Sequence, residues 1–128
     1  MNLKTDILRS YTTIFNAENY TRAIAYETQK PKNPTYLYLN VENVSFLEKR
    51  TGSNVYSIDL SFTFYTNSQI KLNDEIDKIN NILAKYHNYR ETNTTYFYNA
   101  LIQGVEFGTD EDEFKFKITI TLTHEEVE

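Results

Sequence analysis

The residues that could carry catalysis or hold a metal ion are few in this sequence. Cysteine is absent, which rules out thiolate metal ligands, cysteine nucleophiles and disulfides. The two histidines, His87 and His124, lie in separate segments, and neither has a second histidine or a carboxylate at ligand spacing. We therefore predict that both histidines are exposed, that the chain has no metal site, and that it uses no cofactor.

The other reactive patterns are incomplete as well. The acidic run at residues 110–113 lacks the ligand offsets and the central glycine of an EF-hand calcium loop, so it predicts a solvated hairpin tip. The three glycines, Gly52, Gly104 and Gly108, stand alone and form no phosphate-binding loop. No Gly-x-Ser-x-Gly turn offers a serine nucleophile. Together these observations predict a protein without a catalytic site, that is, not an enzyme.

Length and composition indicate one globular domain over residues 1–128. Hydrophobic residues make up 40% of the chain and charged residues 24%, the proportions of a folded protein. The formal net charge is −5 and the 13 Lys and Arg residues are scattered, which argues against specific nucleic-acid binding. No apolar stretch approaches a membrane span, and the N-terminus lacks the order of a secretory signal. We expect a soluble intracellular protein that binds no membrane.

Two segments show the three- and four-residue apolar spacing of amphipathic helices. The first covers residues 3–16. The second covers residues 74–89, with Asn73 as the expected N-cap and Asp74 and Glu75 favourably placed against the helix dipole. The apolar stripes comprise Leu3, Ile7, Leu8, Tyr11, Ile14 and Phe15 in the first helix and Ile76, Ile79, Ile82, Leu83 and Tyr86 in the second.

Two further segments alternate apolar and polar residues and predict strands, at residues 55–65 and 114–123. A strand with one apolar face and one polar face is typical of an antiparallel sheet. The chain that follows, residues 124–128, is acidic and is predicted to be a frayed end. The predicted buried faces comprise Tyr56, Ile58, Leu60, Phe62 and Phe64 in the first strand and Phe114, Phe116, Ile118, Ile120 and Leu122 in the second.

Weaker patterns predict strands at residues 20–28, 35–43 and 95–107, the last bent at Gly104. Residues 44–54 are predicted to be a connection too long for a tight hairpin. The expected order is helix, strand, strand, strand, helix, strand, strand. We therefore predict an α+β fold in which a mostly antiparallel sheet of about four to five strands carries both helices on one face.

The best candidates for contact residues lie away from the predicted core. Tyr36, Tyr38 and Tyr65 lie on the polar face of the sheet, where aromatic side chains can serve a protein interface. Stacking on single-stranded bases is the alternative, which the net charge of −5 disfavours. Asp59 is expected to make a cross-strand or intersubunit hydrogen bond. The apolar pair Phe46-Leu47, placed in the long connection, completes the candidate set as the principal predicted contact.

The order of these elements resembles a known family. A helix precedes the proline-containing stretch Lys30-Pro-Lys-Asn-Pro34 and the strand Thr-Tyr-Leu-Tyr-Leu at residues 35–39. The long strand at residues 56–65 then leads into the single helix Asn-Asp-Glu-Ile-Asp-Lys-Ile-Asn-Asn-Ile-Leu at residues 73–83. A hairpin closes with Phe-Lys-Phe-Lys-Ile-Thr-Ile-Thr-Leu at residues 114–122. Over nearly its whole length the chain resembles the tail terminator, or tail completion, proteins of long-tailed bacteriophages.

The resemblance implies a homo-hexameric ring that caps the tail tube, stops its polymerisation and presents a surface for joining to the head. The implied partners are copies of the chain itself, the tail tube protein and a head-completion or connector protein. The implied location is the tail or neck of the virion, and the host cytoplasm during assembly. The resemblance implies no enzyme activity and no cofactor, and DNA would pass through the ring without specific binding.

Two other functions stay open from the residues alone. The first is a monomeric protein-binding or regulatory α+β module that uses the same tyrosine-bearing surface. The second is a small enzyme, which would require an apolar cleft with converging ionisable groups. The enzyme is the least supported of the three because the sequence supplies no nucleophile–base set.

Overall fold

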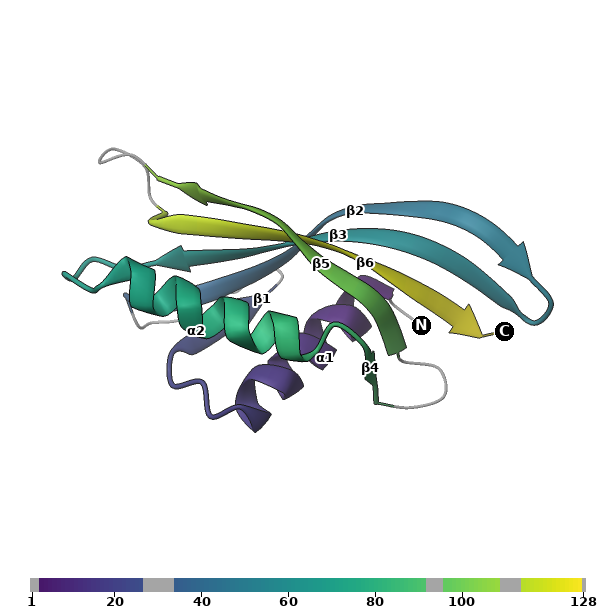
Figure 1. Cartoon of the computed structure of the whole chain (residues 1–128), viewed down its shortest axis with the longest axis horizontal. Coiled ribbons are helices and arrows are strands. Elements are labelled where there is room, and N and C mark those ends of the chain that lie inside the picture. Colours follow the sequence, from purple (N-terminus) through teal and green to yellow (C-terminus); the bar gives the residue numbers. More distant parts are fainter. Residues whose placement is uncertain (1–2, 27–33, 92–95, 109–113, 128) are drawn as a thin grey trace.

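A computed structural model describes residues 3–26, 34–91, 96–108 and 114–127. They form an α+β fold in which both helices lie on the same side of a single curled sheet (Figure 1). No helix among the described residues is long and apolar enough to cross a membrane. The elements are α1 (Leu3–Ala17), β1 (Ala23–Tyr26), β2 (Tyr36–Arg50), β3 (Ser53–Tyr65), α2 (Leu72–Lys85), β4 (Tyr89–Arg90), β5 (Tyr96–Phe107) and β6 (Phe116–Val127).

The sheet has six strands in the order β1-β2-β3-β6-β5-β4. All neighbours are antiparallel except β1 and β2, which run parallel. The predicted fold class and the placement of both helices on one face are confirmed. The predicted strand count was too low because β4 holds only Tyr89 and Arg90, too short to produce a periodic pattern.

The core lies between the helices and the alternating faces of the central strands. Ile58, Leu60, Phe62 and Phe64 of β3 are fully buried, as the alternation predicted. Tyr11 of α1 packs edge-on against Phe62 at a centroid distance of 5.1 Å and stacks on Phe97 of β5 at 4.9 Å. Other fully or almost fully buried core residues are Ile7, Ile14, Phe15, Leu37, Leu39, Ile79, Phe116, Ile118, Ile120 and Leu122.

The connection between the second and third strands is a tight hairpin, so the predicted long connection at residues 44–54 is wrong. Strand β2 continues to Arg50 and pairs with Ser53 across the two-residue turn Thr51-Gly52. The pairing register shifts at Glu42 and again at Leu47, where β2 has bulges. Each bulge moves the following side chains to the opposite face, which hides the alternation in the sequence.

We expect glycine-to-alanine changes in the two hairpins to have opposite effects on stability. Gly52 has a φ of 81°, and the space around its Cα is open, so alanine there costs about 1 kcal/mol through backbone strain alone. Gly104 also has open space around it but no positive φ, so alanine there should stabilise by about 0.5 kcal/mol. Urea unfolding of Gly52→Ala and Gly104→Ala at one protein concentration measures both. Equal effects of the two changes would contradict the backbone explanation.

The second helix is shorter than predicted. It begins at Leu72 with Lys71 at the N-cap position, so the prediction of Asn73 as the cap is wrong. Asp74 and Glu75 do lie in the first turn. The helix ends at Lys85, because the residues after it turn away to form β4 against β5.

The last strand continues where a frayed end was predicted. Strand β6 runs to Val127, and its end pairs with the start of β3, including Tyr56 opposite His124. His124 is therefore buried, which makes the prediction of an exposed residue wrong, while His87 is exposed. The His124 ring donates through Nδ1 to the backbone carbonyl of Tyr96. The predicted acidic tip at residues 110–113 lies outside the described residues.

Candidate assembly surface

Two stretches of the sheet edge lack a neighbouring strand within the described part of the chain. Strand β1 pairs with β2 only as far as Leu39, which leaves residues 40–48 of β2 at an open edge. Strand β4 pairs with β5 only at Tyr96 and Phe97, which leaves residues 101–107 at the opposite open edge. An open edge presents a row of backbone donors and acceptors to which another strand can add.

Apart from Val127 on β6, the exposed large apolar side chains of the described residues lie along these same stretches. Phe46 and Leu47 on β2 are 59% and 55% exposed, and Leu101 and Phe107 on β5 are 61% and 55% exposed. Ile102 and Val105 of β5 are also exposed. Sequence reasoning missed the β5 group. Its signal is the adjacent apolar pair Leu101-Ile102, which breaks the alternation expected of a strand with one buried face.

The pairing register shows which way the β5 side chains point. In an antiparallel pair, directly opposite residues lie on the same face of the sheet. The pairs are Ile102 with Ile120, Val105 with Ile118, and Phe107 with Phe116. Since the β6 members belong to the core under the helices, this edge of β5 extends the helix-bearing face of the sheet.

The same reasoning places Phe46. Its register partner is Tyr56, and the neighbouring pair is Val44 with Ile58, a core residue. The Phe46 and Tyr56 rings meet edge to face at 5.8 Å. Figure 1 shows the β2–β3 hairpin reaching beyond both helices. By its pairing register Phe46 lies on the helix-bearing face of this hairpin, and its side chain is mostly exposed. Phe46-Leu47 therefore lies on a projecting strand rather than in a loop.

The predicted tyrosines lie together on the opposite face. Tyr36 and Tyr65 are cross-strand partners whose rings stack at 4.9 Å, and Tyr38 pairs with Thr63 further along the same strands. All three tyrosines are half-buried. The predicted contact residues thus do not form one patch, because the tyrosines and Phe46 lie at opposite ends of β2 and on opposite faces.

Polar side chains on the outer face satisfy one another across the strands. Asp59 accepts a hydrogen bond of 2.8 Å from Thr121. This is a cross-strand hydrogen bond, one of the two kinds that were predicted for Asp59. The hydroxyl of Ser61 donates to Glu42 at 2.6 Å, and Lys117 approaches the same carboxylate at 3.3 Å. This face is therefore held together internally, and its middle offers few large apolar contacts.

The Glu42 network gives a small pH dependence. The hydrogen bond from Ser61, followed by Lys117, lowers the pKa of Glu42. A lowered folded-state pKa contributes stability above the unfolded value of about 4.3, which is lost as the pH falls through the folded value. We expect Glu42→Gln to lower the free energy of unfolding by under about 1 kcal/mol at neutral pH, because the carboxylate is 39% exposed. In acid the variant and the wild type should have the same stability. Urea unfolding across this range measures it, and in a Ser61→Ala background the difference should shrink.

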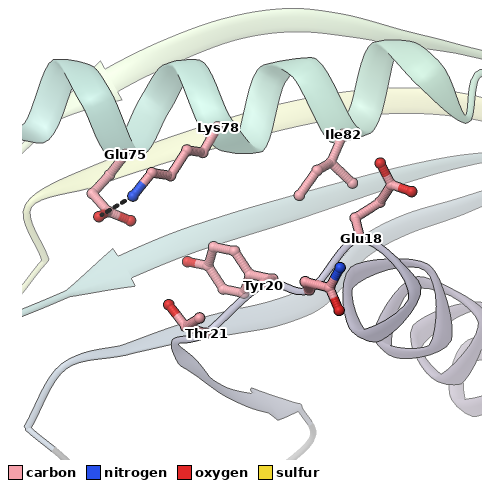
Figure 2. A pocket seen from close by; sticks show the side chains of 7 residues that line it. Glu18, Tyr20, Thr21, Glu75, Lys78 and Ile82 are labelled. Carbon is pink, nitrogen blue, oxygen red and sulfur yellow. Dashed lines mark ion pairs between the residues drawn. The ribbon is translucent and has the colours of Figure 1, made fainter.

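A hollow of about 270 Å³ lies between the chain leaving α1 and helix α2 (Figure 2). Glu75 of α2 is buried beside it. Its Oε1 accepts a hydrogen bond from Arg22 at 2.8 Å and forms an ion pair with Lys78 at 3.5 Å. The lining comprises Glu18, Asn19, Tyr20, Thr21, Glu75, Lys78 and Ile82.

The groups around this hollow are arranged as a structural ion pair. Burial, and then the charge of Glu75, raises the pKa of Tyr20, so its phenol is protonated at neutral pH and is no base. Glu75 is compensated by two cations. The hollow is also smaller than typical ligand pockets of about 300–1,000 Å³. Among the described residues, no three acidic or histidine side chains are grouped to hold a metal ion.

Comparison with known proteins identifies no family or relative for this chain. The chain matches no protein-family model, and no curated protein matches its sequence.

Proposed function

We propose that this chain is a non-enzymatic virion assembly protein of the phage tail terminator kind. Copies form a ring at the end of a tail tube, where the ring ends tube polymerisation and provides the surface to which the head is joined. The order of helices and strands that suggested this family supports the proposal, with β4 as a short addition at one edge of the sheet.

The observation that carries the proposal is the exposure of large apolar side chains at both open edges of the sheet. Monomeric proteins rarely expose large contiguous apolar patches, and such patches usually mark a surface that meets a partner. Phe46 and Leu47 lie at one edge, and Leu101 and Phe107 lie at the other. A folded domain with two such edges is suited to repeated contacts with similar neighbours.

The charge of the chain also suits a ring around DNA. With a net charge of −5, the lumen of a ring would carry no general attraction for phosphates, so DNA could pass without adhering. This favours an assembly role over a nucleic-acid-binding one.

The oligomeric mass of the purified protein tests the proposal. Native mass spectrometry and light scattering should find one closed oligomer, and negative-stain microscopy should show rings. Added to a polymerising tail tube protein, the rings should limit tube length, whereas a heat-denatured sample should not. A monomer at every concentration, with no effect on tube length, would leave the monomeric binding module as the better description.

A further inference from the structure

The two open edges of the sheet are complementary in direction. Strands β2, β3, β6 and β5 are successive antiparallel neighbours, so β2 and β5 run in opposite directions. A second copy placed beside the first in the same orientation would bring its β2 next to β5 of the first, and the new pair would be antiparallel. That is the pairing already used by most of this sheet.

We propose that residues 101–107 of β5 pair with residues 40–48 of β2 in a second copy of this chain, which joins neighbouring subunits through one continuous sheet. This inference rests on the proposed ring and identifies the contact that builds it. The interface is head-to-tail, so each subunit uses both of its edges, and repetition of the contact closes a ring where the rotation allows.

The side chains at the two edges match in face as well as in direction. Ile102, Val105 and Phe107 extend the helix-bearing face at one edge, and Phe46 extends the same face at the other. In the proposed pairing these groups come together on one side of the joined sheet. The apolar layer under the helices of one subunit would then continue into the next subunit.

The β5 edge carries few of the features that prevent strand addition. Proteins protect open edges with lysine, proline, inward-pointing charges or β-bulges. Residues 101–107 contain no lysine or proline, and Glu106 is their one charged residue. Within these residues the pairing register shifts once, between Ile102 and Gly104, which leaves one bulge-type irregularity on this edge.

A second copy explains the two edges better than an unrelated partner does. An unrelated partner that added a strand to β5 would leave the β2 edge and Phe46 exposed. A symmetric dimer through β5 would do the same. The head-to-tail contact covers both edges with one interface, and a closed ring leaves neither open.

Paired cysteines test the contact, because the natural chain has none. Ser45 on the β2 edge and Gln103 on the β5 edge are both exposed. Treated with a short bis-maleimide, Ser45→Cys/Gln103→Cys should give a ladder of covalent species that ends at the mass of the ring. Ser45→Cys alone and Gln103→Cys alone should give no dimers, and Ser45→Cys with Asn81→Cys on the exposed face of α2 should give no ladder.

The outcomes separate this contact from the ring itself. If the protein forms an oligomer but its double-cysteine variant gives no ladder, the edge pairing is overturned while the proposed ring is not. Dimers from either single variant would show a symmetric contact and would also overturn the head-to-tail arrangement. A wild-type monomer at all concentrations would overturn both proposals.

Charges placed on the β5 edge give an independent measurement. Leu101→Lys/Phe107→Lys alters the two most exposed apolar side chains of this edge and should abolish the oligomer at concentrations where the wild type is assembled. Asn81→Lys/Ala84→Lys adds the same charge on the exposed face of α2 and should leave the oligomer intact. Circular dichroism should show both variants folded. A folded edge variant that still assembles fully would contradict the proposal.

Discussion

Replacing Phe46 and Leu47 together by aspartate is expected to abolish self-association and to leave a folded monomer. Both side chains are more than half exposed, and the contact between the aromatic rings of Phe46 and Tyr56 is a single cross-strand pair. Losing such a pair costs about 1 kcal/mol or less of folding free energy. Burying two unpaired carboxylates in an interface costs several kcal/mol, so assembly is affected far more than folding.

Light scattering and thermal unfolding of Phe46→Asp/Leu47→Asp separate these two effects. The matched control is Asn81→Asp/Ala84→Asp, which adds the same charge to the exposed face of α2 and should assemble like the wild type. Loss of the folded circular dichroism signal would show that Phe46 and Leu47 belong to the core. An unchanged oligomer would remove this edge of β2 from the assembly surface.

The parts of the fold that were predictable are those whose pattern reflects burial alone. The alternation of Ile58, Leu60 and Phe62 required one buried face, and the stripe of α1 required a surface to cover. Together these facts fix the two layers. They do not fix strand order, because alternation says which face is buried but not which strand is the neighbour.

The ends of two strands, β2 and β6, were predicted wrongly for local reasons. Bulges at Glu42 and Leu47 reverse the alternation along β2, so residues 44–50 read as a connection. The acidic composition around His124 suggested a frayed end, but the early part of β3 provides a partner strand there. In both places the long-range pairing of β2, β3 and β6 decides the structure against the local pattern.

The candidate surface was predictable only in part. Phe46 and Leu47 stood out because they are apolar residues in a segment predicted to be irregular. The β5 edge could not be recognised without the sheet order, because Ile102 and Val105 look like core residues until β5 is known to lie near an edge. Exposure at an edge is a property of topology, which depends on residues far away in the sequence.

Replacing Arg22 by methionine is expected to destabilise the fold by about 3 kcal/mol, because it leaves the buried carboxylate of Glu75 without its main partner. Glu75 is only 3% exposed, and Arg22 holds its Oε1 at 2.8 Å. Lys78 approaches the same oxygen at 3.5 Å but is 62% exposed, so it compensates only a part of the charge. For the same reason Lys78→Met, the matched control, should cost under about 1 kcal/mol.

A double variant ties the loss in Arg22→Met to the stranded charge rather than to lost packing. Adding Glu75→Gln should restore most of the lost stability, because it removes the uncompensated carboxylate. Urea unfolding of the single and double variants at one protein concentration measures this rescue. A loss that is not rescued by Glu75→Gln would assign the role of Arg22 to the packing of its aliphatic stem between the α1 exit and α2.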